Sequence, residues 1–178
     1  TSFYCKLSHE GLLAVRGVDA GKFLQGQLTC NINYLDEQSS SLGARCTAKG
    51  RMLSSLRIVM QGDGYLLAMA AELLEAQQAE RQRFAVFSKV KLTDESATWV
   101  RFGLSRADSL LPTLGLELPA AANSVASNAG RSAVRLADQR AELWVLAEQA
   151  DEIQAQLAAQ MSEMPLNDWL LGQVHAAI

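Results

Sequence analysis

Apolar and polar residues alternate with period two in several stretches of this chain. In the clearest stretch, 51–61, one face holds Met52, Leu56, Ile58 and Met60, and the other holds Arg51, Ser55, Arg57 and Gln61. This period is typical of a strand with one buried face. Residues 100–104 alternate in the same way, and short strand-like runs predict further strands over 3–7, 12–15, 42–47, 65–70, 90–92, 133–136 and 142–147. The strands at 42–47 and 51–60 form a predicted hairpin across 48–50.

The spacing of apolar residues changes to three and four in the stretch 17–29, which predicts a helix. Its stripe consists of Ala20, Phe23, Leu24 and Leu28, and Asp19 is placed to cap its first turn. Gly26 lies inside this helix, where glycine costs about 1 kcal/mol relative to alanine. Either another backbone or a ligand approaches there, or the helix simply tolerates the glycine. Further helices are predicted over 72–87, over 108–114 with Asp108 as cap, around 153–161, and from 166 onwards.

The polar segment 93–96 marks the predicted domain boundary. Strands and a helix occur on both sides of it, which predicts an α+β protein built from two small mixed units. We expect residues 1–96 to form the first α+β domain and residues 97–161 a second, ferredoxin-like one. The segment 162–178 is expected to form a helix that returns to the first domain.

Composition excludes several classes of protein. The 178 residues are 49% apolar and 20% charged, which is ordinary for a globular chain. A net charge of −3 argues against direct nucleic-acid binding by phosphate neutralisation. No apolar run approaches the ~20 residues of a membrane helix. The chain begins with Thr1 rather than Met, so residues upstream are expected to be missing from it.

The few cysteines and histidines limit the possible chemistry. Cys5, Cys30 and Cys46 are odd in number and widely spaced, which fits neither a disulfide framework nor a zinc site, so we expect reduced thiols in the cytoplasm. His9 and His175 do not lie beside a nucleophile in the sequence. We therefore expect no metal and no hydrolytic triad.

Two groups of residues are candidates for ligand binding. Lys49, Arg51 and Arg57 lie on the polar face of the predicted hairpin, either as a solvated strand face or as a clamp for an anionic tail such as a glutamate carboxylate. Of the three tryptophans, Trp169 differs from Trp99 and Trp144 because it begins a helix after a crossing segment. Flat heterocycles often stack at such positions, although isolated tryptophans usually pack in a core.

Several blocks of this sequence together resemble the YgfZ family, the folate-binding relatives of the glycine-cleavage T-protein (aminomethyltransferase). They occur in one collinear order over nearly the whole chain. The blocks are 15–19, Phe23-Leu24-Gln25-Gly26-Gln27-Leu28-Thr29, Ala48-Lys49-Gly50-Arg51-Met52, Gly62-Asp63-Gly64-Tyr65 and Phe84-Ala85-Val86-Phe87-Ser88-Lys89-Val90.

The resemblance implies a three-domain ring around a central folate pocket, with a role in iron–sulfur protein maintenance and tRNA modification. It implies that tetrahydrofolate is bound, with Trp169 stacking on it. The anionic-tail clamp of Lys49, Arg51 and Arg57, together with Ser54, then supplies the further expected folate contacts. Iron–sulfur enzymes, such as tRNA-modifying enzymes, are the implied partners. The family's Lys-Gly-Cys-Tyr-x-Gly-Gln-Glu signature and its last β-barrel domain are absent from these 178 residues, so we expect the N-terminal portion only.

Ser54 and Ser55 separate an accessory protein from an enzyme. The aminomethyltransferase branch carries adjacent aspartates at the matching positions, and a carboxylate there stabilises charge or moves a proton. A hydroxyl does neither at neutral pH. We therefore expect a tetrahydrofolate-binding accessory protein without catalytic residues, with a folate-dependent aminomethyl or one-carbon transferase as the alternative.

Overall fold

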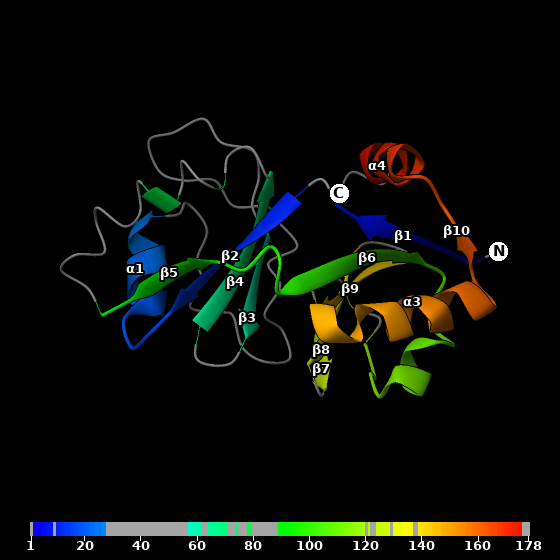
Figure 1. The fold of residues 1–178 in the computed structure, drawn as a ribbon, viewed down its shortest axis with the longest axis horizontal. Coiled ribbons are helices and arrows are strands. Elements are labelled where there is room, and N and C mark those ends of the chain that lie inside the picture. The colour runs from blue at the N-terminus through cyan, green and yellow to red at the C-terminus, as the bar shows by residue number, and fades with distance from the viewer. Residues whose placement is uncertain are drawn as a thin grey trace. The chain divides into compact units, whose positions relative to one another are not determined.

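The chain divides into two compact units in a computed structural model (Figure 1). The structure describes residues 2–8, 10–27, 57–61, 64–70, 74, 78–79, 89–119, 121, 124–128, 130–136 and 139–175. One unit is His9–Ser96, and the other combines Thr1–Ser8 with Ala97–Ile178. No helix among these residues is long and apolar enough to cross a membrane.

An antiparallel sheet forms the frame of the unit His9–Ser96. Its strand order is β3-β4-β2-β5, and the strands are β2 (Glu10–Arg16), β3 (Arg57–Gln61), β4 (Gly64–Ala70) and β5 (Lys91–Asp94). Helix α1 (Ala20–Gln27) contributes Phe23 and Leu24 to a buried cluster that includes Leu13 and Val15 of β2. Residues two apart on β2 therefore face the helix, because side chains two apart on a strand lie on the same face.

The turn before α1 is tied to the segment before β5. The Asp19 carboxylate accepts a hydrogen bond from the backbone N–H of Lys89 at 2.9 Å, and the Asp19 N–H donates to the Lys89 carbonyl at 3.3 Å. The helix begins directly after Asp19, but the hydrogen bond described for this carboxylate goes to Lys89, not to the first turn. Gly26 is exposed, and a Cβ there would meet nothing within 4 Å of the described structure. The close approach considered for this glycine is thus not found.

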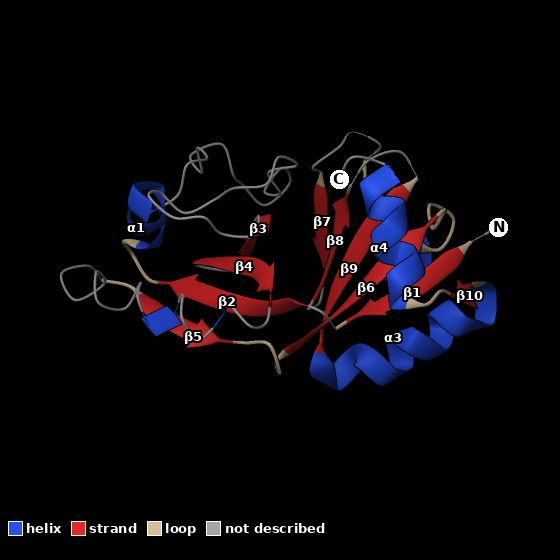
Figure 2. Ribbon diagram, turned by 90° about the horizontal axis from the view of Figure 1, so that it is seen from above, coloured by secondary structure: helices blue, strands red, loops and turns tan. Residues whose placement is uncertain are grey.

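The second unit is built on a six-stranded sheet with the order β10-β1-β6-β9-β8-β7. Its strands are β1 (Phe3–Leu7), β6 (Trp99–Ser105), β7 (Val125–Asn128), β8 (Arg131–Arg135), β9 (Arg140–Leu146) and β10 (Ser162–Glu163). All neighbours are antiparallel except the pair β1–β10. The helices are the short 3₁₀ helix η2 (Leu111–Leu114), α3 (Ala147–Gln160) and α4 (Leu166–His175). Figure 2 shows α3 and α4 beside the strands of this sheet.

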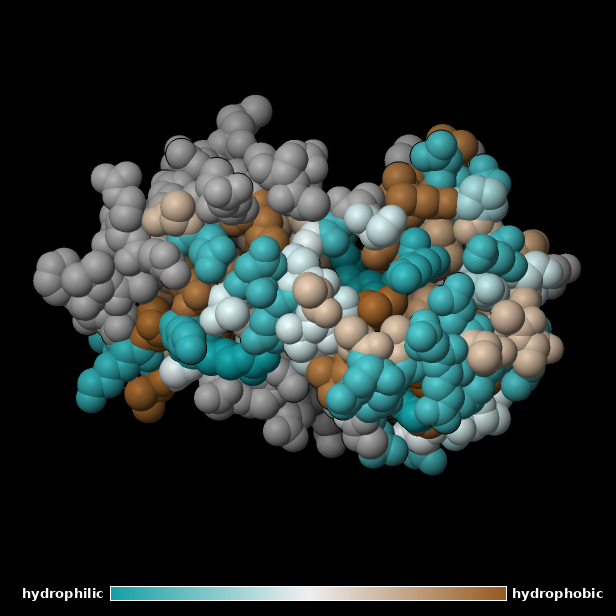
Figure 3. All heavy atoms as spheres, viewed as in Figure 1, coloured by the Kyte–Doolittle hydropathy of each residue, from teal (hydrophilic) through white to brown (hydrophobic). Residues whose placement is uncertain are grey.

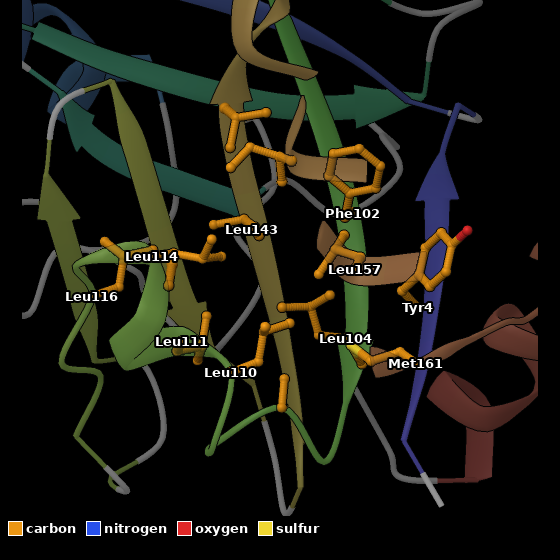
Figure 4. Packing of buried hydrophobic residues seen from close by; sticks show 14 of the residues in the cluster. Tyr4, Phe102, Leu104, Leu110, Leu111, Leu114, Leu116, Leu143, Leu157 and Met161 are labelled. Atoms are coloured by element: carbon orange, nitrogen blue, oxygen red, sulfur yellow. The ribbon is translucent and has the colours of Figure 1, made fainter. Parts of the chain in front are cut away.

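One face of the six-stranded sheet packs against α3. Phe102 and Leu104 of β6 and Leu143 of β9 join Leu157 of α3 in a buried cluster, to which η2 adds Leu111 (Figure 4). The opposite side of α3 is mostly exposed, and it is largely hydrophilic in the space-filling view (Figure 3). The predicted stripe of this helix therefore forms the core contact.

The structure differs from the predicted domain limits at both ends. Residues 1–8 were assigned to the first domain, but β1 pairs with β6 and β10 of the second unit. The segment 162–178 was expected to return to the first domain, but α4 packs on β1 in the second unit. The boundary near 96 is where the two units divide. Strand pairing is non-local, so strands that are consecutive in the sequence enter different sheets.

Some predicted elements are altered, and others lie outside the described residues. η2 begins at Leu111 without a side-chain cap, because its N-cap residue is Leu110, and the Asp108 carboxylate instead pairs with Arg135 at 2.9 Å. Strand β7, rich in small polar residues, was not predicted. The predicted hairpin of strands 42–47 and 51–60 is described only from Arg57, within β3, and its residues 42–56 lie outside the described residues, as does most of the helix expected over 72–87.

Candidate ligand-binding face of the six-stranded sheet

The face of the six-stranded sheet opposite α3 carries charged and aromatic side chains. We call it the α4 face, and define it by Arg101 and Gly103 of β6 and by Arg140, Glu142 and Trp144 of β9. These residues alternate with the apolar residues that pack on α3, so the period of two places them together. Adjacent strands align Arg101 with Trp144 and Gly103 with Glu142.

A buried ion pair lies at the centre of the α4 face. Nε and Nη2 of Arg101 donate to Oε1 of Glu142 at 3.1 and 2.5 Å, and Nε1 of Trp144 donates to the same oxygen at 2.8 Å. The Arg101 guanidinium also lies over the Trp144 ring, 5.0 Å from its centroid. Three donors therefore converge on one carboxylate oxygen.

Glu142 is 4% exposed and is the one acidic side chain that is buried among the residues the structure describes. Burying an ion pair seldom stabilises a fold more than apolar residues of the same size would. Buried charged groups held by specific partners are, for this reason, candidates for functional roles. The pair holds a carboxylate in a defined orientation, and a carboxylate is a strong acceptor for the N–H groups of a ligand.

Helix α4 is attached to this face through Trp169. The indole is 1% exposed, and its ring lies against Gly103, where an added Cβ would lie 2.5 Å from Cε2 of the ring. The Arg140 guanidinium covers the ring with Cζ 4.0 Å from the centroid, and its Nη1 donates to the Trp169 carbonyl at 3.2 Å. Burial lowers the pKa of Arg140, because desolvation penalises the charged guanidinium.

The structure describes two of the five residues predicted to bind folate. Trp169 lies in the second unit and Arg57 in the unit His9–Ser96. Arg57 was placed on the polar face of a strand, but its side chain is buried at 8% exposure in β3, where it is paired in register with Ala68. Lys49, Arg51 and Ser54 lie outside the described residues.

Reasoning from the sequence missed Arg101, Arg140 and Glu142. A signal was present, because Glu142 is a lone acid in the apolar run 141–146, and Arg101 interrupts the alternating strand 99–105. Charges at such positions are either exposed or paired. Only the register of β6 and β9 shows that they form a pair.

The remaining candidate chemistry is limited. No group of three or more His, Cys, Asp or Glu side chains that could hold a metal ion occurs in the described part of the chain. Cys5 is buried and not in a disulfide, and its thiol pKa is raised by burial and, to a smaller extent, by the charge of Glu163. Cys30 and Cys46 are outside the described residues.

Comparison with solved structures defines the class of fold as that of the aminomethyltransferases. The glycine cleavage system aminomethyltransferase T from Bartonella henselae superposes with a TM-score of 0.75 at 18% identity, covering 92% of this chain and 47% of that one. The heterotetrameric sarcosine oxidase from Corynebacterium sp. U-96 gives a TM-score of 0.62 at 15% identity, covering 88% and 81%. The predicted α+β, aminomethyltransferase-like fold is confirmed.

The relatives with the greater sequence identity are YgfZ proteins. The chain is 33% identical over 152 residues to the tRNA-modifying protein YgfZ of Vibrio vulnificus, covering 85% of this chain and 46% of that protein. It is 32% identical over 169 residues to the protein of the same name from Yersinia pseudotuberculosis, covering 93% and 51%. The chain thus spans about half the length of these curated relatives. No protein-family model matches it. The predicted resemblance to the YgfZ proteins is confirmed.

Proposed function

We propose that this protein binds tetrahydrofolate and acts in the cytoplasm as an accessory protein for iron–sulfur cluster assembly or repair and for tRNA modification. The observation that carries the proposal is the similarity to proteins named tRNA-modifying protein YgfZ over 85% and 93% of this chain. The shared fold with an aminomethyltransferase supports a folate-related role. Iron–sulfur enzymes such as tRNA-modifying enzymes are the proposed partners, and direct contact with nucleic acid is not part of the proposal.

The chemistry of the α4 face suits the pterin end of a folate. The pterin is a flat ring system with N–H donors along one edge, and a carboxylate is the natural acceptor for such an edge. We assign this role to Glu142, which Arg101 and Trp144 hold in place. Lys49, Arg51, Ser54 and Arg57, which all belong to the unit His9–Ser96, remain predicted folate contacts, with the cationic side chains suited to an anionic tail.

Trp169 is the proposed stacking surface for the pterin. Because the indole is 1% exposed under Arg140 and against Gly103, a ligand reaches it only when one of its covering groups moves.

Titration of the full-length protein with tetrahydrofolate tests the proposal. We expect saturable binding that Glu142→Gln weakens by about tenfold to hundredfold, because hydrogen bonds to a charged acceptor contribute roughly 1.5–3 kcal/mol. Glu148→Gln on α3 is the matched control, since this acid is exposed in the first turn of that helix. Absence of binding by the wild-type protein would overturn the proposed function. Unchanged affinity in Glu142→Gln would overturn the assignment of Glu142.

An aminomethyl or one-carbon transferase is the second candidate, and the superposition on aminomethyltransferase T favours it. Ser54 and Ser55 argue against it, since catalytic acid–base groups typically contribute 10²–10⁴-fold to a rate. The test supplies the full-length protein with an aminomethyl donor and tetrahydrofolate. Turnover near the ~10 s⁻¹ that is typical of enzymes would establish the transferase instead.

A further inference from the structure

Arg140 occupies the surface of Trp169 on which a flat ligand would stack. Its guanidinium is itself planar and delocalised, and its centre lies 4.0 Å from the ring centroid. This is the separation of a close cation–π contact. A pterin ring and the Arg140 guanidinium therefore compete for the same face of the indole.

The packing around this contact leaves no room for both groups. Gly172 of α4 lies so close to Arg140 that a Cβ at this position would overlap Nη2 and approach Nη1 to 3.0 Å. On its other side, the Trp169 ring lies directly against the backbone of Gly103 in the sheet. A ligand can enter only by displacing the guanidinium, because the sheet backbone and the helix backbone cannot yield as a side chain can.

Displacement of Arg140 gives up its contacts with Trp169, but hydration of the guanidinium compensates part of that loss. Desolvation lowers the pKa of Arg140, so the charged group recovers hydration when it swings into water. Trp169 is the buried residue among the side chains described on α4, and Asn167, Asp168 and Leu171 are exposed. The stack on Trp169 is thus a main attachment of this helix.

Arg140 and Glu142 are two residues apart on the same face of β9, a separation of roughly 7 Å. A ring that replaced Arg140 on Trp169 would have its edge within reach of the Glu142 carboxylate.

We propose that Arg140 is an internal competitor of the ligand: it covers the stacking face of Trp169 in the empty protein and leaves it when a planar heterocycle binds. This inference rests on the proposed folate binding for the identity of the ligand. It predicts that substitution of Arg140 raises the affinity for the ligand, although Arg140 lies in the binding site. Removing a residue that contacts a ligand weakens binding, whereas removing a competitor strengthens it.

The experiment measures Arg140→Ala in the full-length protein by tetrahydrofolate titration and by hydrogen exchange of the α4 amides. A cation–π contact of this kind changes an equilibrium constant by about twofold to thirtyfold, so we expect the affinity for tetrahydrofolate to rise by roughly tenfold. Exchange of the α4 amides should also rise, because the Arg140 guanidinium contacts the ring and the backbone carbonyl of Trp169 on this helix. Arg131→Ala is the matched control, because Arg131 contacts Gln149 and the Leu114 carbonyl instead of α4.

A poorly folded variant would bind tetrahydrofolate more weakly. An increased affinity of Arg140→Ala therefore cannot be explained by loss of structure. Weaker or unchanged binding in Arg140→Ala would overturn the inference, as would unchanged exchange in α4. If neither the wild-type protein nor Arg140→Ala binds tetrahydrofolate, the proposed function fails. Acrylamide quenching of Trp169 fluorescence then decides separately whether Arg140 covers the indole. Quenching that does not rise in Arg140→Ala, measured against the same variants carrying Trp169→Phe, shows that Arg140 does not cover the indole.

Discussion

Gly103 lies directly against the indole of Trp169, with the position of a Cβ only 2.5 Å from Cε2 and 2.6 Å from Cζ2 of the ring. Real Cβ atoms are not found at such distances, so any side chain at Gly103 must push Trp169 away. Since Trp169 is the buried anchor of α4, one missing methyl group on β6 allows a helix more than sixty residues later to dock.

Gly103→Ala should therefore loosen α4. We expect the free energy of unfolding to fall by about 1–3 kcal/mol, the usual cost of overpacking a core. Denaturant unfolding measures the loss, and faster hydrogen exchange in α4 than in α3 locates it. Equal changes in both helices would contradict the docking role of this glycine.

Gly26→Ala should have the opposite effect. Gly26 lies in α1 with an exposed position and open space around its Cβ site, so alanine gains helix propensity without a clash. We expect stability to increase by a few tenths of a kcal/mol and at most about 1 kcal/mol. A lower midpoint in thermal unfolding would indicate that something approaches this side of α1 after all.

Removing one partner of the Arg101–Glu142 pair should be costly, and removing both should cost less. Arg101→Met leaves a buried carboxylate without its cation, which typically costs about 3–5 kcal/mol. The double variant Arg101→Met/Glu142→Leu replaces the pair by apolar groups and should recover a large part of that loss. Denaturant unfolding of the single and double variants forms the cycle. Strictly additive losses would show that the two groups are not coupled.

Stability should decline in alkali through Cys5. Burial raises the pKa of this thiol above its ordinary value of 9.0, so the folded chain keeps the proton to a higher pH than the unfolded chain does. The unfolded chain thus loses its proton first, and stability falls as pH rises above about 9. Unfolding free energies between pH 7 and 10 should fall more in the wild type than in Cys5→Ala. Parallel curves for the two proteins would rule out this contribution.

Local patterns in the sequence were enough to place most of the described elements. The strand at 65–70 and the alternation at 99–104 correspond to β4 and β6, and the stripe of Ile153 and Leu157 is the buried side of α3. These signals depend on residues within one or two turns of one another, where the periods of helix and strand act directly. The resemblance to the YgfZ proteins was likewise readable from short blocks in order.

The pairing of strands was decided by tertiary structure. Strands β1 and β2 are separated by only two residues, Ser8 and His9, yet one pairs with β6 and the other with β4 and β5. The hydrogen-bonding edge of a strand carries no information about its distant partner, so a sequence that reads as a hairpin can serve two sheets. Because β1 and β2 pair in different sheets, the first unit begins at His9 and residues 1–8 belong to the other unit.

The candidate site was also a product of the fold. Sequence alone marked Trp169 as unusual and placed Arg101 and Glu142 on strands. Arg101 and Glu142 are 41 residues apart, however, and they meet only through the register of β6 and β9. The chemistry of each side chain is a property of the sequence. Its burial, its partner and the ring that covers it exist only once the sheet has formed, because they depend on distances between residues that are remote along the chain.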